Sequence, residues 1–163
     1  MDKYRLTDIK IEHEGRTLYR IEALKDFGLI SKGALGGYVE GTHNLSQYGT
    51  CWILNNAKVY GGARVTGCAL VQQNAIICGN VTVGGNASIT GNAVISDKRD
   101  YIVFKNWWSS GRYFTWTRSN DMWSVGCFYG TGEELIRKAY KDSKESGREY
   151  ERIVKYVESI KQL

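Results

Sequence analysis

The densest group of side chains suited to ligand recognition lies between residues 101 and 129, where aromatic and cationic residues are interleaved. The candidate ligand-binding residues are Lys105, Trp107, Trp108, Arg112, Tyr113, Trp116 and Arg118. Aromatic rings stack on nucleobases, and guanidinium groups form charge-assisted hydrogen bonds with phosphate oxygens. Because side chains alternate along a strand, Arg112, Trp116 and Arg118 would share one of its faces. The segment therefore favours a small anionic ligand, such as a nucleotide-derived molecule.

Two other interpretations of this segment stay open. Trp, Tyr and Arg side chains also dominate protein–protein interfaces, so the partner could be another protein. Alternatively, Phe114, Trp116 and Trp123 pack as the core of a small sheet, with the arginines at its rim. We keep the ligand site, the protein interface and the core as alternatives.

The residues on which most enzymes depend are sparse. The chain has two histidines, His13 and His43, and nothing in their surroundings places a general base within reach of a substrate. There is no G-x-x-x-x-G-K-[ST] loop, no nucleophile elbow and no carboxylate pair at a definable spacing. We therefore expect a non-catalytic protein that needs no cofactor.

The cysteines give no sign of a metal site. All four (Cys51, Cys68, Cys78 and Cys127) lack the C-x-x-C spacing of zinc sites. We expect free thiols in a reducing compartment and no bound metal.

The scaffold that must position these residues is a repeat of nine six-residue blocks within residues 44–98. A small residue returns every six positions, and a second series, mostly Val or Ile, follows it two positions later. The second series is Gln47, Ile53, Val59, Val65, Val71, Ile77, Val83, Ile89 and Ile95. Residues two apart point to the same side of a strand, and the Gly and Asn residues between blocks tolerate the positive φ of a corner. Such a period predicts a solenoid of short strands.

The repeat resembles that of left-handed parallel β-helices, in which three blocks form one triangular coil. Blocks three apart then share a face, and two faces carry outward apolar residues. These residues are Trp52, Leu54, Leu70, Tyr60, Ile76 and Val94. Apolar patches usually mark a packing surface, so we expect either the chain's own ends or another subunit to cover them.

Two enzyme families that share the β-helix provide a comparison. The hexapeptide acyltransferases use a His general base and a CoA-type donor, but here His43 lies at the start of the repeat and no loop interrupts the blocks. An acyltransferase-like enzyme therefore stays a minor alternative. The carbonic anhydrases of this fold hold zinc through three His, which two histidines cannot supply.

The segments that flank the repeat complete the predicted fold. Residues 1–43, 44–98 and 99–163 are the expected domains. Residues 3–12 and 16–24 alternate like a hairpin that would cap the first coil, and residues 23–40 would lead irregularly into the repeat.

After the repeat, three strands are expected to form an antiparallel meander. They are Tyr101–Asn106, Arg112–Arg118 and Trp123–Phe128. Thr131 and Glu134 form a capping box that begins a helix, with a break or a solvated stretch within residues 141–149. The predicted fold is thus mainly β: a short left-handed parallel β-helix of about three coils, an N-terminal hairpin cap, and a C-terminal β-meander plus α-helix.

Five stretches of the chain are similar to the opening of a family of hexapeptide-repeat proteins common in bacteriophages and prophages. The stretches are Arg16–Gly28, Leu35–Glu40, Asn44–Gln47, Cys51–Ile53 and Ala57–Gly61. The resemblance covers roughly residues 4–98, and most family members have no assigned role. It implies a phage-type protein in the cytoplasm of a bacterial host. The aromatic–cationic segment and the outward apolar faces then suggest that the protein sequesters a nucleotide-derived defence signal there, or inhibits a host complex by direct contact. A structural or assembly role is a further alternative.

Composition restricts the partners. The 163 residues carry a formal charge of +5 with no basic tract, which suits an anionic ligand better than sequence-specific DNA binding. No apolar run approaches the length of a membrane span, and no signal peptide is evident, so we expect a cytoplasmic protein. The outward apolar faces lead us to expect a homo-oligomer, a dimer or a trimer.

Overall fold

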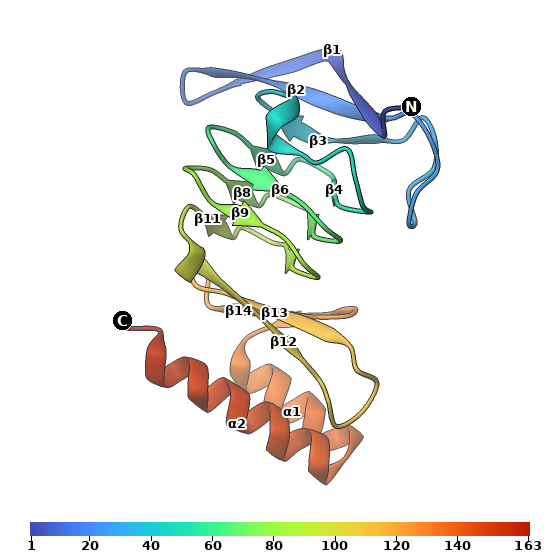
Figure 1. Cartoon of the computed structure of the whole chain (residues 1–163). Coiled ribbons are helices and arrows are strands. Elements are labelled where there is room, and N and C mark those ends of the chain that lie inside the picture. The colour runs from blue at the N-terminus through green and yellow to red at the C-terminus, as the bar shows by residue number, and fades with distance from the viewer.

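The computed structural model describes residues 1–163 and confirms the predicted fold class (Figure 1). A β-solenoid of three turns lies between a cap formed by the N-terminal strands and a C-terminal unit of one sheet and two helices. Its strands are β4 (Trp52–Ile53), β5 (Lys58–Val59), β6 (Arg64–Val65), β7 (Leu70–Val71), β8 (Ile76–Ile77), β9 (Thr82–Val83), β10 (Ser88–Ile89) and β11 (Val94–Ile95). The first block forms no such strand, and Leu45 makes an isolated bridge to Val65.

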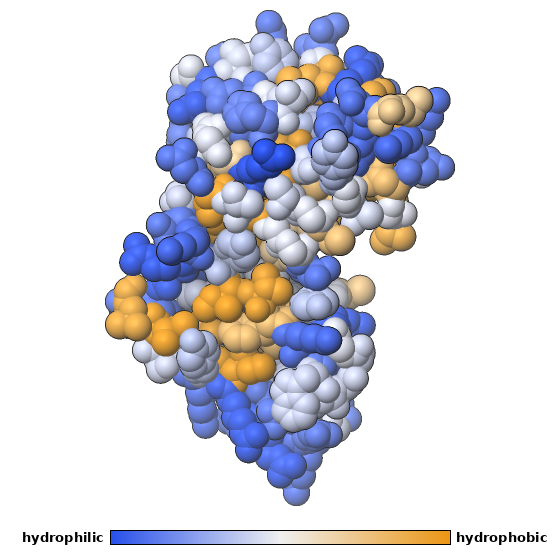
Figure 2. Space-filling model, in the orientation of Figure 1, coloured by the Kyte–Doolittle hydropathy of each residue, from blue (hydrophilic) through white to orange (hydrophobic).

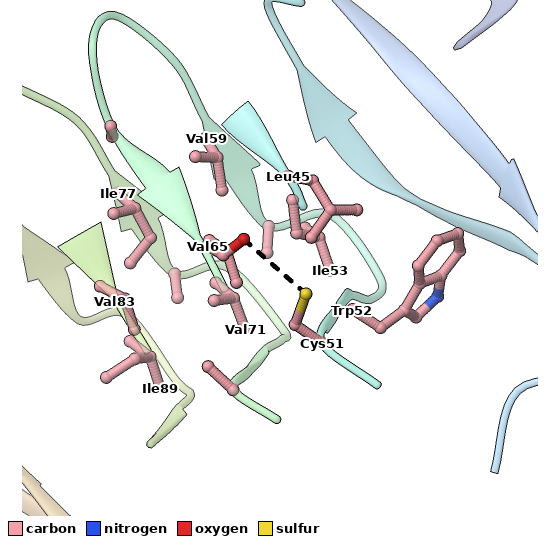
Figure 3. Close-up of a cluster of buried hydrophobic side chains, with 14 of the residues drawn as sticks. Leu45, Cys51, Trp52, Ile53, Val59, Val65, Val71, Ile77, Val83 and Ile89 are labelled. Atoms are coloured by element: carbon pink, nitrogen blue, oxygen red, sulfur yellow. Dashed lines mark hydrogen bonds between the residues drawn. The ribbon is translucent and has the colours of Figure 1, made fainter. Parts of the chain in front are cut away.

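Strands three blocks apart pair in parallel and in register, so each coil takes three blocks. Lys58 lies opposite Ile76, and Ile76 lies opposite Val94. Figure 3 shows the aliphatic side chains stacked inside the coils. All of the series from Ile53 to Ile95 is buried, as the alternation requires.

The corners stack as tightly as the core. Gly49 has a φ of +70°, and a Cβ added there would lie 2.4 Å from the carbonyl oxygen of Gly67 in the next coil. Gly85 has a similar φ of +60°, but a Cβ there would have no neighbour within 4 Å. Substitutions at the two positions therefore distinguish the cost of backbone strain from the cost of disturbing the stacked coils.

We expect Gly49→Ala to destabilise the protein more than Gly85→Ala does. Both substitutions impose the strain of a left-handed backbone on alanine, about 1 kcal/mol or more. Only Gly49→Ala also forces two coils apart, so its midpoint in urea denaturation should fall further. Equal midpoints for the two variants would contradict the stacking of Gly49 on Gly67.

The N-terminal cap extends one face of the solenoid. β1 (Tyr4–His13) and β2 (Arg16–Ala23) form the predicted hairpin, and β2 pairs with β3 (Leu35–Val39). β3 in turn lies parallel to β5, so the segment predicted as irregular contributes a regular strand to a six-stranded sheet.

This cap covers the first coil. The Trp52 ring is 1% exposed and meets Phe27 and Tyr4, with ring centroids 5.2 and 6.2 Å away. Lys3 is equally buried, and its ammonium donates to the carbonyl oxygen of Cys51 at 2.9 Å. Burial lowers the pKa of Lys3. Tyr60 packs with residues of β2 and β3 and is also buried.

Of the six outward apolar residues, the other four stay more exposed. Leu54 and Ile76 are half-buried, and Leu70 and Val94 are 37% and 39% exposed. The N-terminal segment therefore buries only the residues nearest the first coil.

The C-terminal sheet covers the last coil. Its strands are β12 (Tyr101–Lys105), β13 (Tyr113–Thr117), β14 (Met122–Val125) and β15 (Phe128–Gly130). Four strands replace the predicted three, because Gly126 adopts a φ of +57° and turns the expected last strand back on itself.

The face of this sheet toward the solenoid satisfies backbone groups that the last coil leaves unpaired. The hydroxyl oxygen of Thr115 accepts a hydrogen bond from the amide of Ser88 at 2.9 Å, and that of Ser119 accepts one from Val94 at 2.8 Å. The amides of Ser88 and Val94 are therefore paired at the end of the solenoid.

The opposite face of the sheet packs on two helices. Phe114, Trp116 and Trp123 form a second core with α1 (Gly132–Asp142) and α2 (Lys144–Ile160). The single predicted helix is therefore two, and the break predicted within residues 141–149 lies at Ser143. Gly147 is not the break: it lies within α2, where the Tyr140 ring occupies the space of a side chain.

Candidate functional site

A cleft of about 480 Å³ opens between the C-terminal sheet and the two helices. The loop between β12 and β13 forms one wall, and the end of α1 with the start of α2 forms another. The buried side chain of Asn106 orders the loop wall, because its Oδ1 accepts a hydrogen bond from the amide of Gly111 at 3.0 Å. The cleft therefore joins segments distant in the sequence.

Arg112 is the cation at the rim of this cleft. Its guanidinium lies over the backbone of Gly126, where a Cβ would meet Nη1 at 2.6 Å. The side chain is exposed and takes part in no hydrogen bond or salt bridge within the chain. Its donors are therefore free for an external acceptor.

Lys138 is the second cation that lines the cleft. It faces Asp142 one helical turn away, with 3.6 Å between Nζ and Oδ2. Both side chains are more than half exposed, and surface pairs of this kind contribute little energy. The lysine can therefore exchange this carboxylate for a ligand anion at small cost.

Four serine hydroxyls add neutral donors and acceptors to the walls. The four are Ser109, Ser110, Ser143 and Ser146. The hydroxyl of Ser143 caps α2 by accepting from the amide of Ser146 at 3.0 Å. The hydroxyl of Ser146 accepts from the indole of Trp108 at 3.1 Å, which fixes that ring beside the cleft.

The floor of the cleft is apolar. Val125, Leu135 and Ala139 are buried in the second core, and Phe128 is half-buried against it. A ligand with both an anionic group and a flat organic part would meet cations at the rim and carbon below. Small-molecule sites commonly combine these features.

The seven predicted ligand-binding residues do not lie in one place. Only Arg112 lines the cleft. Trp108 is half-buried behind it, with its ring 4.9 Å from that of Tyr150. Lys105, Trp107 and Tyr113 lie on the outside of the β12–β13 hairpin, where the ammonium of Lys105 is 5.9 Å from the Tyr113 ring.

Trp116 and Arg118 lie at the other end of β13 from Arg112 and do not line the cleft, which corrects the prediction of one ligand site. Trp116 is fully buried, and its indole donates to Asp121 at 2.8 Å. Burial acts to raise the pKa of Asp121, but this bond and that from Lys161 outweigh it, so the pKa is lowered. Arg118 donates to the carbonyl oxygens of Arg99 and Lys161, which ties the C-terminus to the sheet.

Lys138 and the serines were missed by sequence reasoning. Lys138 lies on a helix whose packing angle against the sheet decides whether it faces the cleft. The only sequence signal was the Ser-rich composition around residues 109 and 143, which turns and helix caps also explain.

The two histidines lie near the N-terminal cap. His13 ends β1 with its ring edge toward Tyr60, at 5.3 Å between centroids. The Nε2 atom of His43 is 2.8 Å from the carbonyl oxygen of Gly61. No three His, Cys, Asp or Glu side chains gather as metal ligands would. Neither helix has the length and apolarity that crossing a bilayer requires.

Comparison with known proteins adds no assignment, since no family model and no curated protein matches the chain. A function for this chain must therefore be inferred from the geometry of the cleft.

Proposed function

We propose that this is a non-catalytic binding protein that holds a small anionic molecule in the cleft between the C-terminal sheet and helices. The observation that carries this proposal is the free guanidinium of Arg112 at the rim of a cleft with an apolar floor. A guanidinium binds a phosphate group through bidentate hydrogen bonds. Such charge-assisted hydrogen bonds are about twice as strong as hydrogen bonds between neutral groups.

The ligand class follows from the cleft lining. Arg112 and Lys138 would bind the anionic group together with the serine hydroxyls, and Val125 and Phe128 would contact the organic part. Nucleotide-derived molecules combine these two parts. The formal charge of +5 favours their approach over that of cations.

The biological setting rests on the repeat. Its resemblance to phage and prophage hexapeptide-repeat proteins supports a role in the cytoplasm of a bacterial host. There the protein would sequester a nucleotide-derived defence signal and so keep it from its receptor. Sequestration requires binding without turnover, which the cations, hydroxyls and apolar residues of the cleft can provide.

Native mass spectrometry of protein purified gently from bacteria tests this function. The folded protein should carry a stoichiometric extra mass of a few hundred daltons for each chain, and denaturation should release it. Release of an uncharged molecule, or of one without phosphate or carboxylate, would contradict the proposal.

A second candidate is a protein that inhibits a host complex by direct contact. Trp107 and Tyr113 are 69% and 45% exposed at the tip of the β12–β13 hairpin, and both residue types are common in interface hot spots. The same native spectrum separates the two functions, since this one predicts a stable heteromeric complex with no small ligand.

A further inference from the structure

The outer edge of β12 is the longest unpaired strand edge in the C-terminal unit. β12 is the first strand in the sheet order β12-β13-β14-β15, so only one of its sides is paired. The side chains of Tyr101–Phe104 are all half-buried, so each keeps part of its surface accessible to solvent. Figure 2 shows a continuous apolar area over this part of the molecule, between the solenoid and α2.

The backbone pairing shows which groups point outward. At the two ends of β12, the amide of Asn106 donates to Arg112 and the amide of Arg118 donates to the carbonyl oxygen of Asp100. Hydrogen-bonded pairs alternate along an antiparallel ladder, so Ile102 and Phe104 also bond to β13. The backbone groups of residues 101, 103 and 105 therefore face the free edge. Of these, the carbonyl oxygen of Lys105 already accepts a hydrogen bond from the amide of Trp107 at 3.0 Å and keeps one lone pair for a second.

This edge has little of the usual protection against pairing, because its only charged side chain is that of Lys105 at its end. The chain contains no proline, and the stretch Tyr101–Phe104 contains no charge. Its register with β13 is continuous over five residue pairs, so no bulge twists the edge away. Long apolar edges without such features pair with other strands.

We propose that β12 pairs antiparallel with β12 of a second copy of this chain, about a two-fold axis through Val103. Two copies of β12 form hydrogen bonds only in registers that place residues 101, 103 and 105, whose backbone groups face the free edge, opposite one another. Centring the axis on Val103 also pairs Tyr101 with Lys105 of the partner subunit. Each of these three pairs can exchange two hydrogen bonds, with the carbonyl oxygen of Lys105 accepting the new bond on its second lone pair. The result is one continuous sheet of eight strands.

The side chains of β12 complement one another in this register. Ile102 lies opposite Phe104 of the partner subunit on the helix-facing side, so the second core continues across the axis. On the other side, the ammonium of Lys105 lies beside the ring of the partner's Tyr101, a favourable cation–aromatic contact. No like charges meet, which is what an isologous interface requires.

Disulfide trapping tests both the interface and its register. In a background with the two exposed cysteines removed (Cys68→Ser, Cys127→Ser), Val103→Cys places two thiols at the axis. Cα atoms of a hydrogen-bonded antiparallel pair are about 5.5 Å apart, within the range of a disulfide. Mild oxidation should give a covalent dimer, and sedimentation of the unmodified protein should give twice the 18.4 kDa chain mass.

Tyr101→Cys is the matched control on the same face of the same strand. The two copies of residue 101 would lie about 14 Å apart along the strands, too far for a bond. A mixture of Tyr101→Cys and Lys105→Cys proteins should cross-link, whereas Tyr101→Cys alone should not. Failure of Val103→Cys to cross-link, or equal cross-linking of Tyr101→Cys alone, would overturn the proposal.

Discussion

Trp116→Ala should lower the free energy of unfolding by about 3–5 kcal/mol, as removal of a fully buried indole does elsewhere. Trp116 is 0% exposed and packs in the second core between the sheet and the helices. The change also leaves Asp121 without the hydrogen bond from the indole and removes the ring beneath the guanidinium of Arg118. Urea denaturation followed by far-ultraviolet circular dichroism measures the loss.

Trp107→Ala is the control for this prediction, because its indole is 69% exposed. Exposed substitutions usually change stability by less than about 0.5 kcal/mol. If both variants lost the same stability, the two tryptophans would not have the different environments that the structure gives them. A stable Trp116→Ala protein would reopen the sequence-based prediction that this ring contacts ligand.

Ile77→Ala should cost about 2–5 kcal/mol, because it opens a cavity in the middle coil of the solenoid. Ile77 is fully buried and pairs with Val59 in the preceding coil and Ile95 in the next, so both neighbouring coils lose contacts. The neighbouring Ile76→Ala removes the same atoms from an outward, half-buried side chain. Its loss in thermal or urea denaturation should be less than half as large, and equal losses would contradict the inward stacking.

The solenoid could be predicted from sequence because its structure repeats locally. In each block the alternation of small and β-branched residues sets the direction of the side chains, and the glycines set the corners. The register follows from the period, since a shift by one residue would turn Ile53 or Val71 outward. No long-range information was needed for this part of the fold.

The C-terminal unit was predicted less completely because its details depend on tertiary packing. Trp123 to Phe128 alternates like one strand, and only the left-handed conformation of Gly126 divides it. Similarly, the break predicted within residues 141–149 lies at Ser143 and not at Gly147, whose lack of a side chain admits the Tyr140 ring between α1 and α2.

The cleft could not be predicted for the same reason. It exists because α1 and α2 pack at a particular angle on the sheet, with the Phe114 and Tyr150 ring centroids 5.0 Å apart. Of the predicted residues, this packing directs Arg112 to the cleft and Trp116 into the core. Composition alone gives both residues the same expected role.

Isothermal titration of the purified protein with ATP, a cyclic dinucleotide and inorganic pyrophosphate tests the central claim most directly. The matched variants are Arg112→Ala in the cleft and Arg64→Ala, which removes the same charge from an exposed position on the solenoid. We predict saturable binding of at least one nucleotide, weakened at least tenfold by Arg112→Ala. A hydrogen bond to a charged group contributes about 1.5–3 kcal/mol, and 1.4 kcal/mol corresponds to a factor of ten. Arg64→Ala should bind as the unmodified protein does. Binding of none of the three probes, or equal affinity of the two variants, would contradict the assignment of the cleft as a nucleotide site.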